Sequence, residues 1–407
     1  ESTRGRRPSY RRAFHLRGAE LLNELLTILP SLLDDLRDRG HPYRRATVAG
    51  WGLEAIDDGA TVPDLTRLRR RLLEELADAA DRLGEREEQR AALDELSALD
   101  IDVDEDPSAA GRIYLLHARH AVSSGQFGLA RGLLRNARQL MEKPSRAALS
   151  EADARQQSFD RAEIERLAAR IEAEHSEFRQ ASKYASKALD LAPDPVSRAE
   201  AHLLRAEIEI LDGSVESALK RLSHARREIR SEEGGLRARS TRASISLVTG
   251  RAWRLVGRPY RAARAFERAT ELAVKAGEGR IEVEVAARHG RLLADVGREH
   301  ESELILRDAL FSARRIEDKR GEALAALFLG ILLGEKGVSG AADLIRRATA
   351  LAEELGQGRI EALSAAIEGR IAFGMDDIKL ALERSAHGWD LVRRHGAELP
   401  DRIVIGG

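Results

Sequence analysis

The 407-residue sequence contains no cysteine. It therefore has no disulfide bond, no thiolate nucleophile and no cysteine-ligated metal. Aromatic residues make up only 4% of the chain while charged residues make up 33%, a balance that favours elongated helical stacking over a compact core around a cofactor. The formal net charge is −1, so no strong overall field attracts nucleic acid or an acidic membrane.

The common catalytic and cofactor-binding motifs are also missing. We find no G-x-G-x-x-G after a strand, no Walker lysine motif, no G-x-S-x-G and no H-E-x-x-H. The longest apolar run, residues 323–334, is too short to span a membrane and predicts a buried helix. The basic N-terminus lacks the apolar stretch of a signal peptide. We expect a cytoplasmic, non-catalytic protein with no cofactor, although an enzyme need not carry a motif.

Glycine recurs at a fixed interval. Gly250, Gly290, Gly330 and Gly369 are forty, forty and 39 residues apart, and the first three are each followed by another glycine seven residues later. A period of this length is typical of stacked repeats, each a helix, a short turn and a second helix. We interpret the first glycine of a unit as a close contact between its two helices. The second glycine then ends the first helix, where it accepts a left-handed conformation.

Small and bulky residues alternate after each glycine pair. In the best copy these are Gly250, Gly257, Ala262, Phe266 and Ala269. This pattern resembles the tetratricopeptide repeat, and weaker copies begin near Ala118, Ala169 and Ala206. The resemblance implies an all-α fold: an α-solenoid superhelix of antiparallel helix pairs with an N-terminal helical cap region. Units near forty residues long are similar to those of bacterial multidomain signalling proteins, including ATPase-linked regulators.

The sequence divides into three parts. Residues 1–110 form an N-terminal helical region and acidic linker, residues 111–395 form the array of about seven units, and residues 396–407 form a non-helical tail. The tail contains Ile403–Ile405, which suggest the start of a strand. The chain begins without methionine, and we expect it to be a piece of a longer protein with a flanking effector domain.

The N-terminal part has weaker signals. We expect residues 1–17 to be loosely ordered, residues 18–37 to form a helix bent or interrupted at Pro30, and residues 41–64 to form a turn region. Asp64 is a plausible cap for the first of two further helices, over residues 65–83 and 87–99. These helices are either a degenerate first repeat or part of another domain.

Two clusters have the residue types of a metal site. Alternating aspartates at 100, 102, 104 and 106 have the oxygen spacing of a calcium loop, but the glycine and glutamate that such a loop needs are missing. We favour a solvated acidic linker. His117 and His120 are three residues apart on one helix without a third ligand nearby, so we favour packing or a polar groove position. We therefore expect no metal site.

One pattern suggests a binding surface. By analogy with known repeats, the residue after each mid-helix small position should face the concave groove, and five of these seven residues are arginine. They are Arg119, Arg170, Arg251, Arg291 and Arg370. Since guanidinium groups suit carboxylate and phosphate ligands, we predict a row of donors with little neutralisation. We expect reversal of Arg251 and Arg291 to glutamate to abolish partner binding and leave the helices intact.

Three functions remain open. The first is a protein-protein interaction module, the sensor or scaffold arm of a bacterial signalling protein, which binds an acidic peptide or partner domain in its groove. The second is a nucleic-acid-binding repeat protein, which we disfavour because glutamates interleave and aromatic stacking platforms are few. The third is an enzyme with an unrecognised site.

Overall fold

The protein is described here by a computed structural model. It describes residues 9–39, 41–83, 85–99, 103, 106–143, 151–232, 235–374 and 376–395. Within these residues the regular elements are nineteen helices, and there is no strand. The predicted all-α fold is therefore confirmed. None of the helices that the structure describes is both long and apolar enough to cross a membrane. The strand-like tail, residues 396–407, lies outside the described residues.

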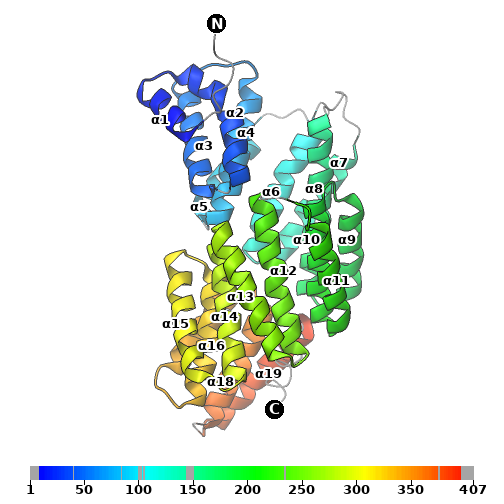
Figure 1. The fold of residues 1–407 in the computed structure, drawn as a ribbon, viewed down its shortest axis with the longest axis vertical. Coiled ribbons are helices and arrows are strands. Elements are labelled where there is room, and N and C mark those ends of the chain that lie inside the picture. Colours follow the sequence, from blue (N-terminus) through cyan, green and yellow to red (C-terminus); the bar gives the residue numbers. More distant parts are fainter. Residues whose placement is uncertain are drawn as a thin grey trace.

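Five helices precede the array (Figure 1). They are α1 (Tyr10–Gly18), α2 (Leu22–Arg39), α3 (Pro42–Asp57), α4 (Leu65–Leu83) and α5 (Arg86–Ala98). The four helices α1, α2, α3 and α4 share a cluster of buried residues, mostly leucines and alanines, that includes Trp51. The two helices predicted after residue 64 are confirmed as α4 and α5. Asp64 directly precedes α4, but its backbone is left-handed (φ 58°) rather than extended as at a usual N-cap.

Three predictions for this region are wrong. Residues 10–17, expected to be loosely ordered, belong to α1, whose first turn is capped by the Ser9 side chain. Pro30 lies inside α2, so the helix is not interrupted there, and α2 begins at Leu22 rather than at residue 18. The predicted turn region contains α3. Its glycines disfavour a helix in isolation, but Gly52 packs so tightly that an added Cβ would lie 2.6 Å from Leu29. Here tertiary packing overrides intrinsic propensity.

Fourteen helices follow and form seven consecutive antiparallel pairs. The first helices of the pairs are α6 (Pro107–Ser123), α8 (Glu151–Glu174), α10 (Pro195–Leu211), α12 (Leu236–Leu255), α14 (Gly279–Asp295), α16 (Lys319–Glu335) and α18 (Gly358–Gly374). The second helices are α7 (Phe127–Glu142), α9 (Phe178–Leu191), α11 (Val215–Glu228), α13 (Pro259–Ala276), α15 (Glu299–Arg315), α17 (Ala341–Glu354) and α19 (Ile378–His395). The division into domains near residues 110 and 396 stays a prediction.

The recurring glycines pack as expected. A Cβ at Gly250 would lie 2.5 Å from Phe266, and one at Gly290 would lie 2.6 Å from Leu306. Both partners come from the second helix of the same pair and are fully buried. Gly257, which follows Gly250 by seven residues, is left-handed with φ 70°. The first glycine therefore sets the distance between paired helices, and the second allows the turn between them.

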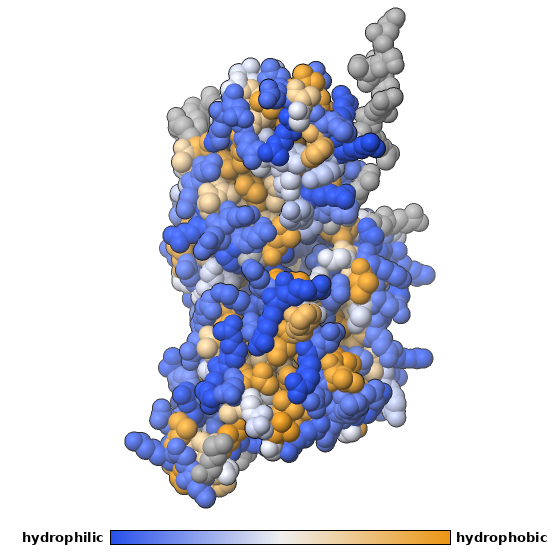
Figure 2. All heavy atoms as spheres, turned by 90° about the vertical axis from the view of Figure 1, so that its left-hand side faces the viewer, coloured by the Kyte–Doolittle hydropathy of each residue, from blue (hydrophilic) through white to orange (hydrophobic). Residues whose placement is uncertain are grey.

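The apolar run at residues 323–334 lies in α16 and is buried among neighbouring pairs, as predicted. The outer surface is mostly charged and polar. Figure 2 shows one face of the molecule, where hydrophilic side chains cover most of the surface and hydrophobic side chains form smaller patches between them. The fold thus buries its aliphatic residues between layers of helices and leaves its charges at the surface.

Candidate binding surface on the inner face

The first helices of the pairs form one continuous layer. Each packs against the first helix of the next pair, from α6 to α18, while each second helix packs against its own partner and the next first helix. In a curved stack, the layer whose members touch their neighbours lies on the inner side. We call the surface of this layer the inner face. The charged residues of these helices that concern it are Arg112, Arg119, Glu163, Arg170, Glu200, Glu207, Arg251, Glu284, Arg291, Arg320 and Arg370.

The superhelix closes on itself. Arg359 of α18 donates a hydrogen bond to the carbonyl oxygen of Ala173 at 2.8 Å and forms an ion pair with Glu174 at 3.3 Å. The ring of His395, at the end of α19, donates through Nδ1 to the carbonyl oxygen of Glu174 at 2.9 Å. These residues are about two hundred positions apart in sequence, so the last pair returns to the second pair and encloses the inner face.

Opposite charges face each other across this enclosed surface. The carboxylate of Glu284, and further those of Glu174 and Glu207, raise the pKa of Arg320 against the opposing effect of burial. Burial also works to raise the pKa of Glu284, but the guanidinium groups of Arg320, Arg288 and Arg251 hold it at about 2. Both groups are therefore charged at neutral pH, and each stabilises the other.

The predicted site residue Arg119 is bound to the N-terminal region. Its guanidinium lies 3.1 Å from Asp78 and 3.7 Å from Asp81, both on α4. Two helical turns earlier on α6, the guanidinium of Arg112 donates hydrogen bonds to the carboxylates of Asp160, at 2.8 Å, and Glu74, at 3.2 Å. These ion pairs fasten α4 to the first two repeats, so Arg119 has a structural role in addition to any role in binding.

Arg251 and Arg291 also have acidic partners. Arg251 lies 3.9 Å from Glu207 on the preceding first helix, and only 11% of its side chain is exposed. Arg291 lies 3.2 Å from Asp295, which also binds Arg254 at 2.6 Å. The predicted lack of neutralisation is therefore wrong for these two residues and for Arg119. Their role in binding a partner stays a prediction.

Arg170 and Arg370 have a different environment. Both are exposed, on α8 and α18 respectively. No described carboxylate forms a salt bridge with either side chain. The guanidinium of Arg170 nevertheless acts with those of Arg166 and Arg119 to lower the pKa of Glu163 against the effect of burial. Arg370 is therefore the predicted arginine whose guanidinium is more open to a ligand.

Sequence reasoning missed the acids of the inner face, although a signal was present. Glu163 and Glu284 stand seven residues before Arg170 and Arg291 on the same helices, and Glu200 stands seven before Glu207. Seven residues are close to two helical turns, so these pairs share a face. A search for acids at this offset finds Glu163, whose pKa Arg170 helps to lower. It does not find the salt-bridge partners of Arg119, Arg251 and Arg291, which are Asp78, Glu207 and Asp295.

The metal candidates have other contacts. Nε2 of His117 lies 2.8 Å from the hydroxyl of Ser97, and Nδ1 of His120 lies 2.9 Å from the side-chain oxygen of Gln89, so each ring packs against α5. Asp106 caps α6 and pairs with Arg70. Its three companions, at positions 100, 102 and 104, lie outside the described residues. Among the described side chains, no cluster of three or more could hold a metal ion.

Comparison with known proteins gives matches to solved structures only. No protein-family model and no curated protein sequence matches the chain. Solved structures do match it. A Rap protein complexed with competence and sporulation factor is 14% identical, with a TM-score of 0.65 over 91% of this chain and 98% of that one. A Rap conjugation gene regulator of plasmid pLS20, in complex with the Phr* peptide, is also 14% identical, with a TM-score of 0.51 over 83% and 93%.

Identities of this size establish the fold alone. The match covers nearly the whole of both chains in the first case, so it includes the N-terminal helices as well as the seven pairs. The chain is therefore a tetratricopeptide-like helical repeat protein.

Proposed function

We propose that the chain is a non-catalytic interaction module that binds a peptide or an extended segment of a partner protein on its inner face. The observation that carries this proposal is that the charged side chains of that face are held in place by ion pairs. The successive first helices contribute charged side chains there. Ion pairs hold several of these side chains in place, between repeats, with α4 or within one helix. These ion pairs keep the face rigid, so an extended chain can bind there at a low entropic cost.

The structural neighbours support this proposal. Both Rap structures described above contain a bound factor or peptide. A shared fold does not transfer a ligand, but it supports the view that a repeat superhelix of this length has room for one. We further propose a bacterial signalling setting, in which partner binding shifts the equilibrium between two arrangements of the superhelix and so releases an effector.

The ligand should be acidic where it meets Arg170 and Arg370. Both guanidinium groups are exposed and form no salt bridge with a described carboxylate, although Glu163 partly compensates Arg170. Arg251 and Arg291, which lie between them, have acidic partners within 4 Å. Acidic side chains of a ligand therefore gain most at these two positions, through charge-assisted hydrogen bonds.

Selection from a random peptide library displayed on phage tests this proposal. The wild-type chain should enrich acidic peptides, and the double variant Arg170→Glu/Arg370→Glu should lose them. The matched control is Arg307→Glu/Arg346→Glu, which reverses two exposed arginines of the second helices α15 and α17. Failure to enrich any peptide, or equal enrichment by all three proteins, would contradict the proposal.

A further inference from the structure

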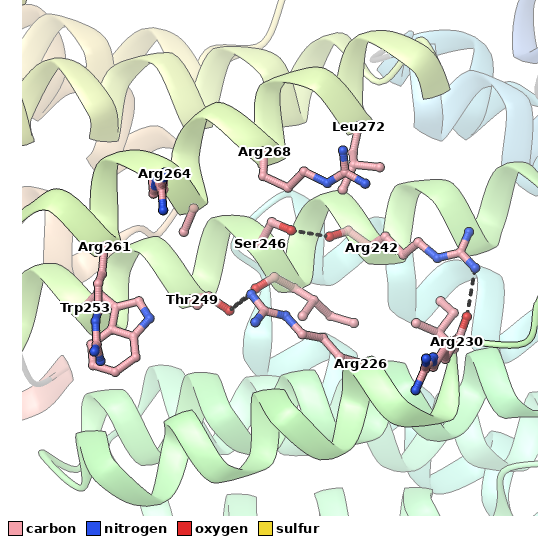
Figure 3. A pocket seen from close by; sticks show the side chains of 13 residues that line it. Arg226, Arg230, Arg242, Ser246, Thr249, Trp253, Arg261, Arg264, Arg268 and Leu272 are labelled. Atoms are coloured by element: carbon pink, nitrogen blue, oxygen red, sulfur yellow. Dashed lines mark hydrogen bonds between the residues drawn. The ribbon is translucent and has the colours of Figure 1, made fainter.

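A pocket of about 570 Å³ lies away from the inner face, between the second helices α11 and α13 and over the first helix α12. Figure 3 shows that side chains from all three helices converge on it. Six of its lining residues are arginines: Arg226, Arg230, Arg242, Arg261, Arg264 and Arg268. Ser246, Thr249 and Trp253 add hydroxyls and one aromatic ring. No aspartate or glutamate of the described residues lines the pocket.

The contacts of these arginines leave most of their charge uncompensated. Arg226 donates to the hydroxyl of Thr249 at 3.1 Å, and Arg242 donates to the carbonyl oxygen of Ile229 at 2.8 Å. Both partners are neutral. Arg261 stacks on the Trp253 ring at 4.7 Å. Burial lowers the pKa of Arg226, with no carboxylate acting against it.

The remaining three arginines, Arg230, Arg264 and Arg268, are also available to a ligand. Arg268 pairs with Glu271 at 2.8 Å, but both side chains are more than half exposed, so that pair is weak. No described carboxylate forms a salt bridge with Arg230 or Arg264. Six cations held around one pocket repel one another, and an anion bound among them relieves that repulsion.

The basic cluster is local to this pocket. Forty residues on, where the next repeat has its equivalent positions, Arg242, Arg261 and Arg268 are replaced by acids. These are Glu282, Glu301 and Asp308. A surface for duplex nucleic acid needs a basic stripe that continues along the protein. A single basic pocket instead suits a small ligand, and its volume is in the range of ordinary small-molecule sites.

We propose that this pocket binds a small polyphosphate ligand, such as a nucleoside triphosphate, through the forked guanidinium groups of α11, α12 and α13. Arginine forks match the oxygen geometry of phosphate, and several phosphates in one ligand satisfy several forks. The indole of Trp253, with Arg261 stacked on it, offers a flat surface at which a base would lie. The site is separate from the inner face and does not depend on the function proposed there.

Isothermal titration calorimetry of the full chain with ATP and EDTA tests this site, with inorganic triphosphate and adenosine as separate titrants. Binding of both phosphate compounds but not adenosine is expected, and tighter binding of ATP would assign the base to the Trp253 surface. Arg230→Gln/Arg264→Gln should weaken binding on the order of tenfold for each arginine removed, since each forms charge-assisted hydrogen bonds. Added salt should weaken it further.

The matched control is Arg307→Gln/Arg346→Gln, which removes the same charge from α15 and α17. It should bind as wild type does. Equal weakening by both double variants would show diffuse attraction rather than a site. The proposal would also be overturned by binding of adenosine alone, by binding of a DNA duplex without binding of triphosphate, or by no binding at all.

Discussion

The inner face and the pocket between α11 and α13 are both rich in arginine. They differ in whether nearby carboxylates compensate the charge of the guanidinium groups. On the inner face, Arg119, Arg251 and Arg291 each lie within 4 Å of a carboxylate. In the pocket, two arginines bond to neutral oxygens and one stacks on an aromatic ring. The difference lies in the surrounding helices, not in the arginines.

This contrast separates a structural use of arginine from a binding use. A compensated guanidinium holds two helices together and has little left for a ligand, since a ligand must displace its partner. An uncompensated one costs the folded protein electrostatic energy until an anion binds. The five arginines chosen from repeat position include three of the first kind. The pocket contains six that repeat position does not select, and five of these form no salt bridge with a described carboxylate. Partners, rather than residue type, decide which arginines can bind.

The largest expected effect comes from reversing charge on the inner face. Arg251→Glu/Arg291→Glu would place new carboxylates beside Glu207 and Asp295, and we now expect it to destabilise the array by about 5 kcal/mol, contrary to the expectation from sequence. Urea unfolding followed by circular dichroism measures this. Arg370→Glu, at an exposed position that forms no salt bridge with a described carboxylate, should change the midpoint little. Equal midpoints for the double variant and Arg370→Glu would remove the distinction between compensated and open arginines.

The second prediction concerns acid. The pKa of Glu284 is about 2 in the folded chain and 4.5 for an ordinary glutamate, so its ionisation stabilises the fold above pH 4.5 and loses that effect as pH falls toward 2. Glu284→Gln should therefore be less stable than wild type at pH 7 by roughly 3 kcal/mol. The gap should narrow by about 1 kcal/mol at pH 3.5. Thermal melts at both pH values check this, and a gap independent of pH would contradict it.

The third prediction concerns the spacing of paired helices, on which both surfaces depend. Gly290→Leu would force a side chain into Leu306, whose Cγ lies 2.6 Å from an added Cβ, at a cost of about 2 kcal/mol. Gly132→Ala is the control, because an added Cβ meets nothing within 4 Å there. That change should raise the melting temperature, since alanine favours a helix by about 1 kcal/mol. A higher melting temperature in both variants would show that Gly290 is not a packing contact.

Gly290 also shows why the fold could be predicted from sequence. A contact made within one repeat recurs every forty residues, so the pairs Gly250–Phe266 and Gly290–Leu306 carry the same signal at the same spacing. The N-terminal region has no such repetition. There Gly52 contacts Leu29 and Leu72 on two other helices, and a contact made once leaves no periodic trace. Local propensity then misplaces α3.

The binding surfaces could be predicted only in part for the same reason. Repeat position placed five arginines on first helices, but it does not show which of them have acidic partners. Arg119 is compensated by Asp78 of α4 and Arg251 by Glu207 of another repeat, and neither contact follows from repeat position. The pocket is harder still to predict from the sequence. It combines Arg226 of α11 with Arg242 of α12 and Arg264 of α13, and its basic character breaks the repeat instead of following it.

The smallest expected effect comes from the pocket and has the opposite sign. Without ligand and at low salt, Arg264→Gln should leave stability unchanged or raise it by a few tenths of a kcal/mol, because it removes one of six cations that repel one another. High salt should abolish the gain, since ions screen the repulsion. Thermal melts at two salt concentrations measure this, with Arg307→Gln, whose partner Glu303 lies at 2.9 Å, as the paired counterpart. Loss of stability in Arg264→Gln alone would mean that this guanidinium already has a stabilising partner, and the contrast with the inner face would fail at that residue.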